Sequence, residues 1–109
     1  GDEEGLVLRD RQQLAADGIL IAVVTVDAQT GQSVAPPELV ARGFVHDDER
    51  LKDVLDECAG ALQELMAELG AERVTGQKLI REDINQRLSE LVFQRTRRRP
   101  LIMPVVVEV

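Results

Sequence analysis

The chain has 109 residues, and its 20 acidic and 13 basic side chains give a formal net charge of −7. This length predicts one domain that folds without a disulfide or a structural metal, and the negative charge argues against a free-standing nucleic-acid-binding domain, which is usually basic. A single cysteine, no apolar run of membrane-spanning length and no secretory signal predict a cytoplasmic protein with no membrane partner.

The first half of the chain predicts an entry segment followed by two strands. Residues 1–17 are mostly polar, and we interpret them as a linker to a single domain of residues 18–109. The run ILIAVVTV, residues 19–26, is rich in β-branched residues and predicts the first strand. A loop with two prolines follows, and then ELVARGFV predicts a second strand at residues 39–45, compatible with an antiparallel pair.

A long amphipathic helix is predicted next. Asp47 and Asp48 are candidate N-caps, and apolar residues then recur at three- and four-residue spacing from Leu51 to Leu69. This spacing places one apolar stripe on a helix. Gly70, just beyond the last apolar residue, is the predicted C′ residue.

A second helix and a third strand complete the predicted order. Thr75 is the candidate cap for a helix whose apolar stripe runs from Leu79 to Val92. Four arginines are predicted in its last turn, where cations favour the helix dipole: Arg95, Arg97, Arg98 and Arg99. Pro100 ends that helix, and residues 101–109 predict a strand that is apolar on both faces.

The order β-β-α-α-β predicts an α+β two-layer sandwich, in which two helices cover one face of a three-stranded sheet. The first and last strands carry apolar residues on both faces, although a sheet covered on one side usually alternates polar and apolar residues. The second apolar face therefore predicts a contact with another subunit or domain. The candidate contact residues are Ile102, Val105, Val106, Val107 and Val109.

The residues that could carry chemistry are few. His46 to Asp48 could in principle ligate a metal ion, but acids are expected at a helix start. Cys58 lies on the apolar stripe of the first helix and is interpreted as core, and no serine has a partner constellation for nucleophilic catalysis. We therefore expect no catalytic residue, no metal ligand and no cofactor in this chain.

The arginine cluster allows two interpretations. One is charge complementarity at a helix end together with salt bridges to the many acids. The other is a patch that contacts the phosphates of RNA. No aromatic residues are interleaved to stack on bases, so such contacts would be made to the nucleic-acid backbone.

Three stretches in order, LAADGI, ARGFV and QRTRRRPLIMPVVVEV, resemble the C-terminal domain of ribonuclease J. The resemblance begins near Leu14 and covers nearly the whole chain. Arg98, Arg99 and Pro100 fill the family's Arg-Arg-Pro, and residues 101–109 fill its final apolar strand ending in Glu-Val.

The resemblance implies a parent enzyme that is a cytoplasmic bacterial ribonuclease for RNA processing and decay, with endonuclease and 5′-to-3′ exonuclease activities. It implies zinc ions in a metallo-β-lactamase domain with an inserted β-CASP domain. The family's His-x-His-x-Asp-His motif has no counterpart in a chain with one histidine, so no catalytic or metal residue is carried over.

Three functions stay open from the sequence. The first is an inactive assembly domain that self-associates, most simply as a dimer, and supports the catalytic domains of the parent ribonuclease. The second is an RNA-contacting module that uses the patch from Arg95 to Arg99. The third is a stand-alone regulatory domain that binds a small ligand.

Overall fold

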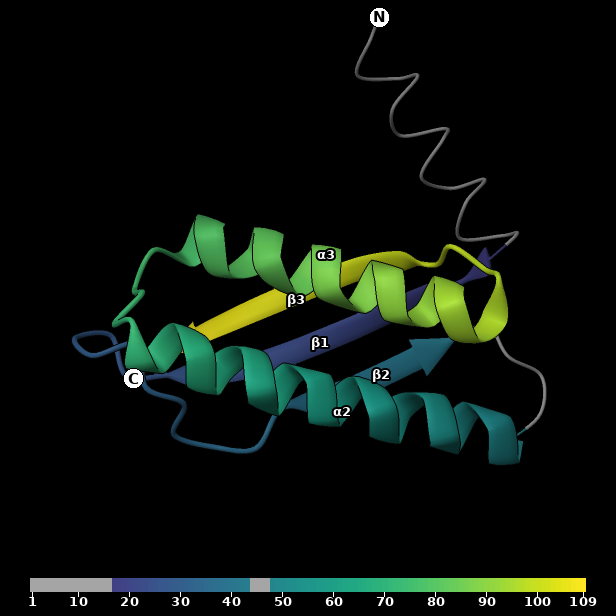
Figure 1. Cartoon of the computed structure of the whole chain (residues 1–109), viewed down its shortest axis with the longest axis horizontal. Coiled ribbons are helices and arrows are strands. Elements are labelled where there is room, and N and C mark those ends of the chain that lie inside the picture. Colours follow the sequence, from purple (N-terminus) through teal and green to yellow (C-terminus); the bar gives the residue numbers. More distant parts are fainter. Residues whose placement is uncertain (1–16, 44–47) are drawn as a thin grey trace, which may run out of the picture.

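The structure is a computed structural model that describes residues 17–43 and 48–109. The predicted α+β fold and its β-β-α-α-β order are confirmed. Two helices lie side by side over a three-stranded sheet (Figure 1). The elements are β1 (Ile19–Val26), β2 (Glu38–Arg42), α2 (Asp48–Ala71), α3 (Gln77–Thr96) and β3 (Leu101–Glu108).

The sheet is mixed, with the strand order β2-β1-β3. β1 pairs antiparallel with β2, with Ile21 opposite Val40, and parallel with β3, with Ile19 opposite Leu101. The central position suits β1 because its run of β-branched residues is apolar on both faces. The parallel pairing is possible because β2 and the two helices intervene between β1 and β3.

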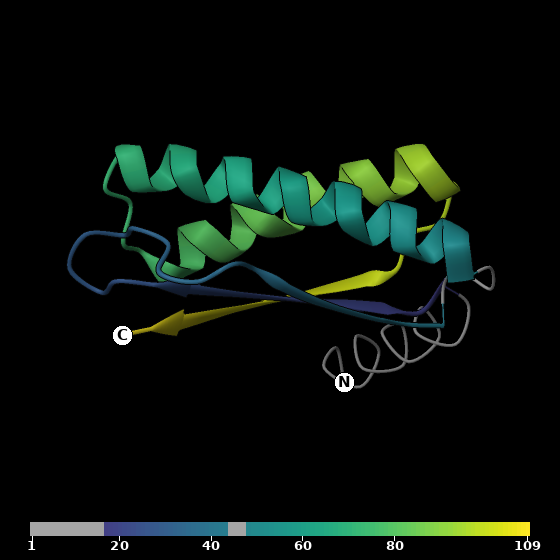
Figure 2. The same cartoon turned by 90° about the horizontal axis from the view of Figure 1, so that it is seen from below.

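Both helices pack on the same face of the sheet, as the view along the layers shows (Figure 2). Successive side chains of a strand point to opposite faces, and the even-numbered residues of β1 from Leu20 to Val26 face the helices and are at most 2% exposed. The core is aliphatic apart from Cys58, and its largest fully buried members are Leu20, Val24, Val26, Leu62, Ile80, Ile84, Leu88 and Val92.

The end of α2 differs from its prediction. Gly70 lies inside the helix, and the residue in the left-handed conformation is Arg73, with φ 56°. The Arg73 N–H donates to the Gly70 carbonyl, and the Val74 N–H donates to the Leu69 carbonyl, 2.9 Å away. These two bonds form a Schellman motif. It holds Arg73 in a conformation that usually favours glycine, so the prediction of Gly70 as C′ was wrong.

Both ends of α3 also differ from the prediction. Gly76, rather than Thr75, is the N-cap, and its carbonyl accepts a hydrogen bond from the Ile80 N–H. The helix ends at Thr96, so only Arg95 of the four arginines lies in the last turn. Arg97 follows in the left-handed conformation, with φ 60°.

Part of the predicted organisation falls outside the described residues. The second strand was expected at residues 39–45 and is observed at Glu38–Arg42, whereas residues 44 and 45 are not described. The same is true of His46, of the candidate cap Asp47 and of residues 1–16 of the expected linker.

The loop after β1 is fixed by Asp27 and Gly31. The Asp27 carboxylate accepts hydrogen bonds from the N–H groups of Gln29 (2.8 Å) and Thr30 (3.0 Å). These bonds lower the pKa of Asp27 below its usual 3.8. Gly31 has φ +75° and lies against the backbone of Val74. The loop therefore docks on the end of α2 through backbone contact.

Candidate interaction surfaces

The face of the sheet opposite the helices is apolar along β1 and β3 apart from Thr25, whereas β2 places the charged Glu38 and Arg42 on it. Its centre is formed by the half-buried odd-numbered residues of β1, Ile19 to Val23. On the flanking strands, Val40 is 40% exposed and Met103 is 42% exposed, and both lie opposite Ile21. We call this surface the open face. Its apolar character confirms the prediction that the strands are apolar on both sides.

The predicted contact residues divide between the two faces. Val105, Val107 and Val109 lie on the open face, where they are 39%, 40% and 68% exposed. Ile102 is only 5% exposed, and Val106 packs against the core under the helices. Because the side-chain period of a strand is two, Ile102 and Val106 belong to the covered face. The candidate contact on the open face is therefore narrower than the sequence indicated.

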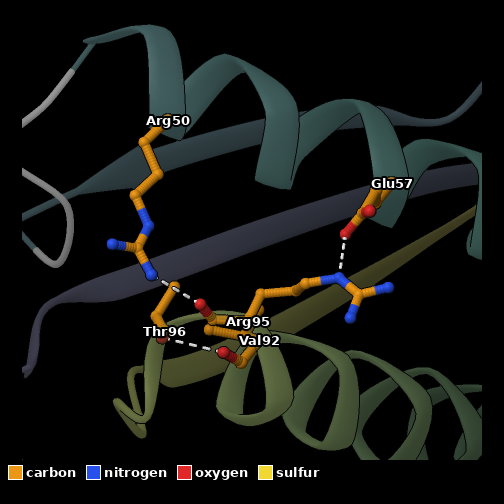
Figure 3. Close-up of polar contacts among 5 residues, drawn as sticks. All are labelled: Arg50, Glu57, Val92, Arg95 and Thr96. Atoms are coloured by element: carbon orange, nitrogen blue, oxygen red, sulfur yellow. Dashed lines mark hydrogen bonds and ion pairs between the residues drawn. The ribbon is translucent and has the colours of Figure 1, made fainter.

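One arginine of the cluster, Arg95, forms hydrogen bonds with residues of α2. The Arg95 Nε donates to the Glu57 Oε2 of α2 at 2.6 Å, and Arg50 donates to the Arg95 carbonyl at 2.7 Å (Figure 3). The Thr96 hydroxyl donates to the Val92 carbonyl and accepts the Arg98 N–H. For Arg95, this geometry favours the interpretation of helix-end charge and salt bridges.

Two further arginines gather on one ring. The guanidinium carbons of Arg97 and Arg99 lie 5.5 Å and 4.2 Å from the centre of the Phe93 ring. Both distances are typical of cation–π contacts. The Arg99 N–H also donates to the Asp17 carboxylate at 3.2 Å. The segment after α3 thus carries concentrated positive charge on an ordered backbone.

The acidic partner of Arg95 could not be found from the sequence. Glu57 and Arg95 are 38 residues apart in the chain, and no local pattern links them. The contacts with Phe93 could have been expected, because Phe93 lies only four and six residues before Arg97 and Arg99 in the sequence. The four arginines were predicted as one patch, whereas Arg95 bonds to Glu57 and two others lie over the Phe93 ring.

Cys58 is consistent with its interpretation as core, whereas His46 and Asp47 lie outside the described residues. Cys58 is fully buried, and burial, followed by the nearby Glu57 charge, raises the pKa of its thiol to about 11. Within residues 17–43 and 48–109, no group of three or more histidine, cysteine or acidic residues is placed to hold a metal ion. Neither described helix is long and apolar enough to cross a membrane.

The whole chain is similar to known ribonucleases. It is 41% identical over 110 residues to "Ribonuclease J 2" of Staphylococcus aureus strain NCTC 8325, and 38% identical over 109 residues to "Ribonuclease J 2" of Staphylococcus epidermidis. Both alignments cover 100% of this chain but only 19% of the relative. Residues 6–109 match the family described as the ribonuclease J C-terminal domain, and the chain therefore belongs to that family.

Proposed function

We propose that this chain is the assembly domain of a ribonuclease J-like enzyme. In this proposal the domain joins copies of the enzyme and supports catalytic domains that belong to the rest of the protein. The observation that carries it is the open face, where Met103, Val105 and Val107 form an exposed apolar row on β3. An apolar row of this kind on one side of a sheet is typical of an interaction surface.

The activity of the parent enzyme is part of the same proposal. The relatives named above are ribonucleases, and the chain spans 19% of their length. We propose that the whole protein processes and degrades RNA in the cytoplasm, as an endonuclease and a 5′-to-3′ exonuclease. We further propose that zinc acts in its metallo-β-lactamase and β-CASP part, and that this chain by itself is not an enzyme.

Light scattering across a dilution series tests self-association. We expect this chain to form a dimer at micromolar concentration, and Val107→Asp to shift it toward the monomer because a buried charge without a partner opposes association. Leu79→Asp is the matched control. It places the same charge at another exposed apolar position, in the first turn of α3, where an acid favours the helix dipole.

Two results would contradict the proposal. One is a wild-type chain that stays monomeric at every concentration. The other is a Val107→Asp variant that keeps both its folded spectrum and its association.

A second function, contact with RNA, is favoured by the two guanidiniums held over Phe93. Binding through phosphates weakens steeply as salt rises. If this interpretation holds, replacing Arg97, Arg98 and Arg99 by Gln abolishes salt-dependent RNA binding. Replacing Lys52, Lys78 and Arg81 by Gln removes the same charge elsewhere and leaves the binding in place. Equal loss in both triple variants would mean that only net charge matters.

A further inference from the structure

β3 has a free edge within the described part of the chain, because β1 is its only neighbour in the sheet. The Leu101 N–H donates to the Gly18 carbonyl, and the Val109 N–H donates to the Val26 carbonyl. The backbone groups of successive residues in a strand point to opposite edges, so the odd-numbered residues of β3 are the ones bonded toward β1. The even-numbered residues direct their N–H and C=O groups outward: Ile102, Pro104, Val106 and Glu108.

Pro104 fits this alternation. A proline has no N–H and would break the ladder if it stood at a position facing β1. At an outward position it removes no bond within the sheet. The outer edge of β3 still offers the N–H groups of Ile102, Val106 and Glu108 and four carbonyls to a further strand.

The two edges of the sheet are protected to different degrees. β2 has five residues, its exposed ends Glu38 and Arg42 are charged, and Pro37 precedes it. β3 has eight residues, and Glu108 is its only charged one. Native proteins shorten, charge or cover the edges of their sheets, because a long apolar edge is a template for another strand. Pro104 blunts the β3 edge at one position, but β3 is the longer and less charged edge, and it is therefore the one better suited to pair with a further strand.

The charges around β3 are complementary to those of a second, antiparallel copy of the same strand. Arg98 and Arg99 precede β3, and Glu108 is at its end. Two identical strands related by a twofold axis run antiparallel, so the Glu108 end of each copy lies beside the Arg98 and Arg99 end of the other. The groove between α3 and β3 carries both signs, with Lys78 and Arg81 beside Glu82, which also suits a self-complementary contact.

We infer that two copies pair along the outer edges of β3, antiparallel, and form one continuous six-stranded sheet. This inference rests on the proposed function and names the geometry of the self-association. The open-face residues Val105 and Val107 of one copy then pack beside those of the other as cross-strand neighbours. The protected β2 strands form the two outer edges of the joined sheet.

Pairing along the edge and stacking through the open face predict opposite results for two variants. Val106→Pro removes an outward N–H, as Pro104 already does, and keeps an apolar side chain over the core. We expect the dimer dissociation constant to rise at least about tenfold, since each dimer loses two hydrogen bonds. Val40→Asp changes the open face on β2, far from the β3 edge, and should leave the constant unchanged. Sedimentation measures both, and far-UV circular dichroism confirms that each variant is folded.

A charge-exchange experiment tests the antiparallel direction without a proline. Glu108→Arg, and separately the double variant Arg98→Glu with Arg99→Glu, each place like charges at both ends of a homodimer, and each should weaken association. In a mixture of the two variants, both ends of a heterodimer carry opposite charges again. We therefore expect mixing to restore association.

The outcomes separate this inference from the proposed function. Suppose that Val40→Asp weakens the dimer, that Val106→Pro associates like the wild type, and that the mixed charge variants associate no better than either variant alone. Copies then stack through the open face. Pairing through β3 is then overturned, and the assembly role stands. If the wild-type chain is monomeric at every concentration, both fail.

Discussion

The contact between Gly31 and Val74 gives the sharpest stability prediction. A Cβ atom added at Gly31 would lie 2.4 Å from the Val74 carbonyl oxygen, a distance at which one backbone segment has to move. An L-residue at φ +75° also costs about 1–2 kcal/mol. Since displacement of the loop also strains the end of α2, we expect Gly31→Ala to lower the free energy of unfolding by about 2–4 kcal/mol in total.

Gly60→Ala is the matched control for this prediction. Gly60 lies inside α2, and apart from its chain neighbours and the backbone of its own helical turns no atom lies within 4 Å of where its Cβ would be. Alanine is a better helix former than glycine, so the same change there should raise the free energy of unfolding by about 0.5–1 kcal/mol. The two substitutions are thus expected to have opposite signs.

Urea unfolding followed by far-UV circular dichroism measures both effects. The chain has no Trp or Tyr, so intrinsic fluorescence is a poor probe. All variants are compared at one protein concentration, because association contributes to apparent stability. A Gly31→Ala variant within about 0.5 kcal/mol of the wild type, with an unchanged urea dependence, would refute the steric reasoning.

Three further predictions concern buried and titrating groups. Ile84→Ala, at a fully buried position, should lower the free energy of unfolding by about 2–5 kcal/mol, whereas Leu79→Ala, at a position 51% exposed, should cost far less; similar losses in thermal or urea unfolding would contradict the assigned core. The Cys58 thiol, with its pKa raised from 9.0 to about 11, should resist thiol reagents at neutral pH and react only on unfolding. Labelling of the folded chain at the rate of a free thiol would disprove this protection. The stability that the neutral Cys58 thiol contributes is present below pH 9 and is lost as the pH rises toward 11. The pKa of Asp27 is lowered, so its stabilising effect is present above pH 3.8 and is lost as the pH falls below that value. The stability difference between the wild type and Asp27→Ala should therefore shrink on acidification, and a constant difference would argue against the turn hydrogen bonds as its source.

The sequence predicted elements best where packing leaves a repeated signal. The bounds of β1, residues 19–26, were predicted correctly because a run of β-branched residues has few other stable conformations. The apolar stripes of α2 and α3 likewise have the helical period. Alternation in β3 does not tell which face the helices cover, and the predicted contact residues therefore included Ile102 and Val106 from the covered face.

The errors lie at helix ends and in contacts between distant residues. Gly70 and Thr75 are residue types that often cap helices, but the residue type alone does not tell whether that residue or a nearby one is the cap. The backbone bonds of the Schellman motif let Arg73 take the role expected of Gly70. The parallel pairing of β3 with β1 and the bond between Arg95 and Glu57 join residues far apart in the chain, and no local pattern encodes them.

The position of β3 in the chain has a consequence for how the domain reaches its native state. The central strand is made first, but its parallel neighbour is made only after both helices, and Ile19 pairs with Leu101. Nearly the whole domain must therefore be synthesised before the backbone groups on one edge of β1 can form their hydrogen bonds with β3. Contacts so distant in sequence close slowly, because loop closure costs entropy before any pairing repays it. During synthesis, the apolar side of the nascent helices and the unpaired edge of β1 stay exposed. A chaperone would be most useful in this interval.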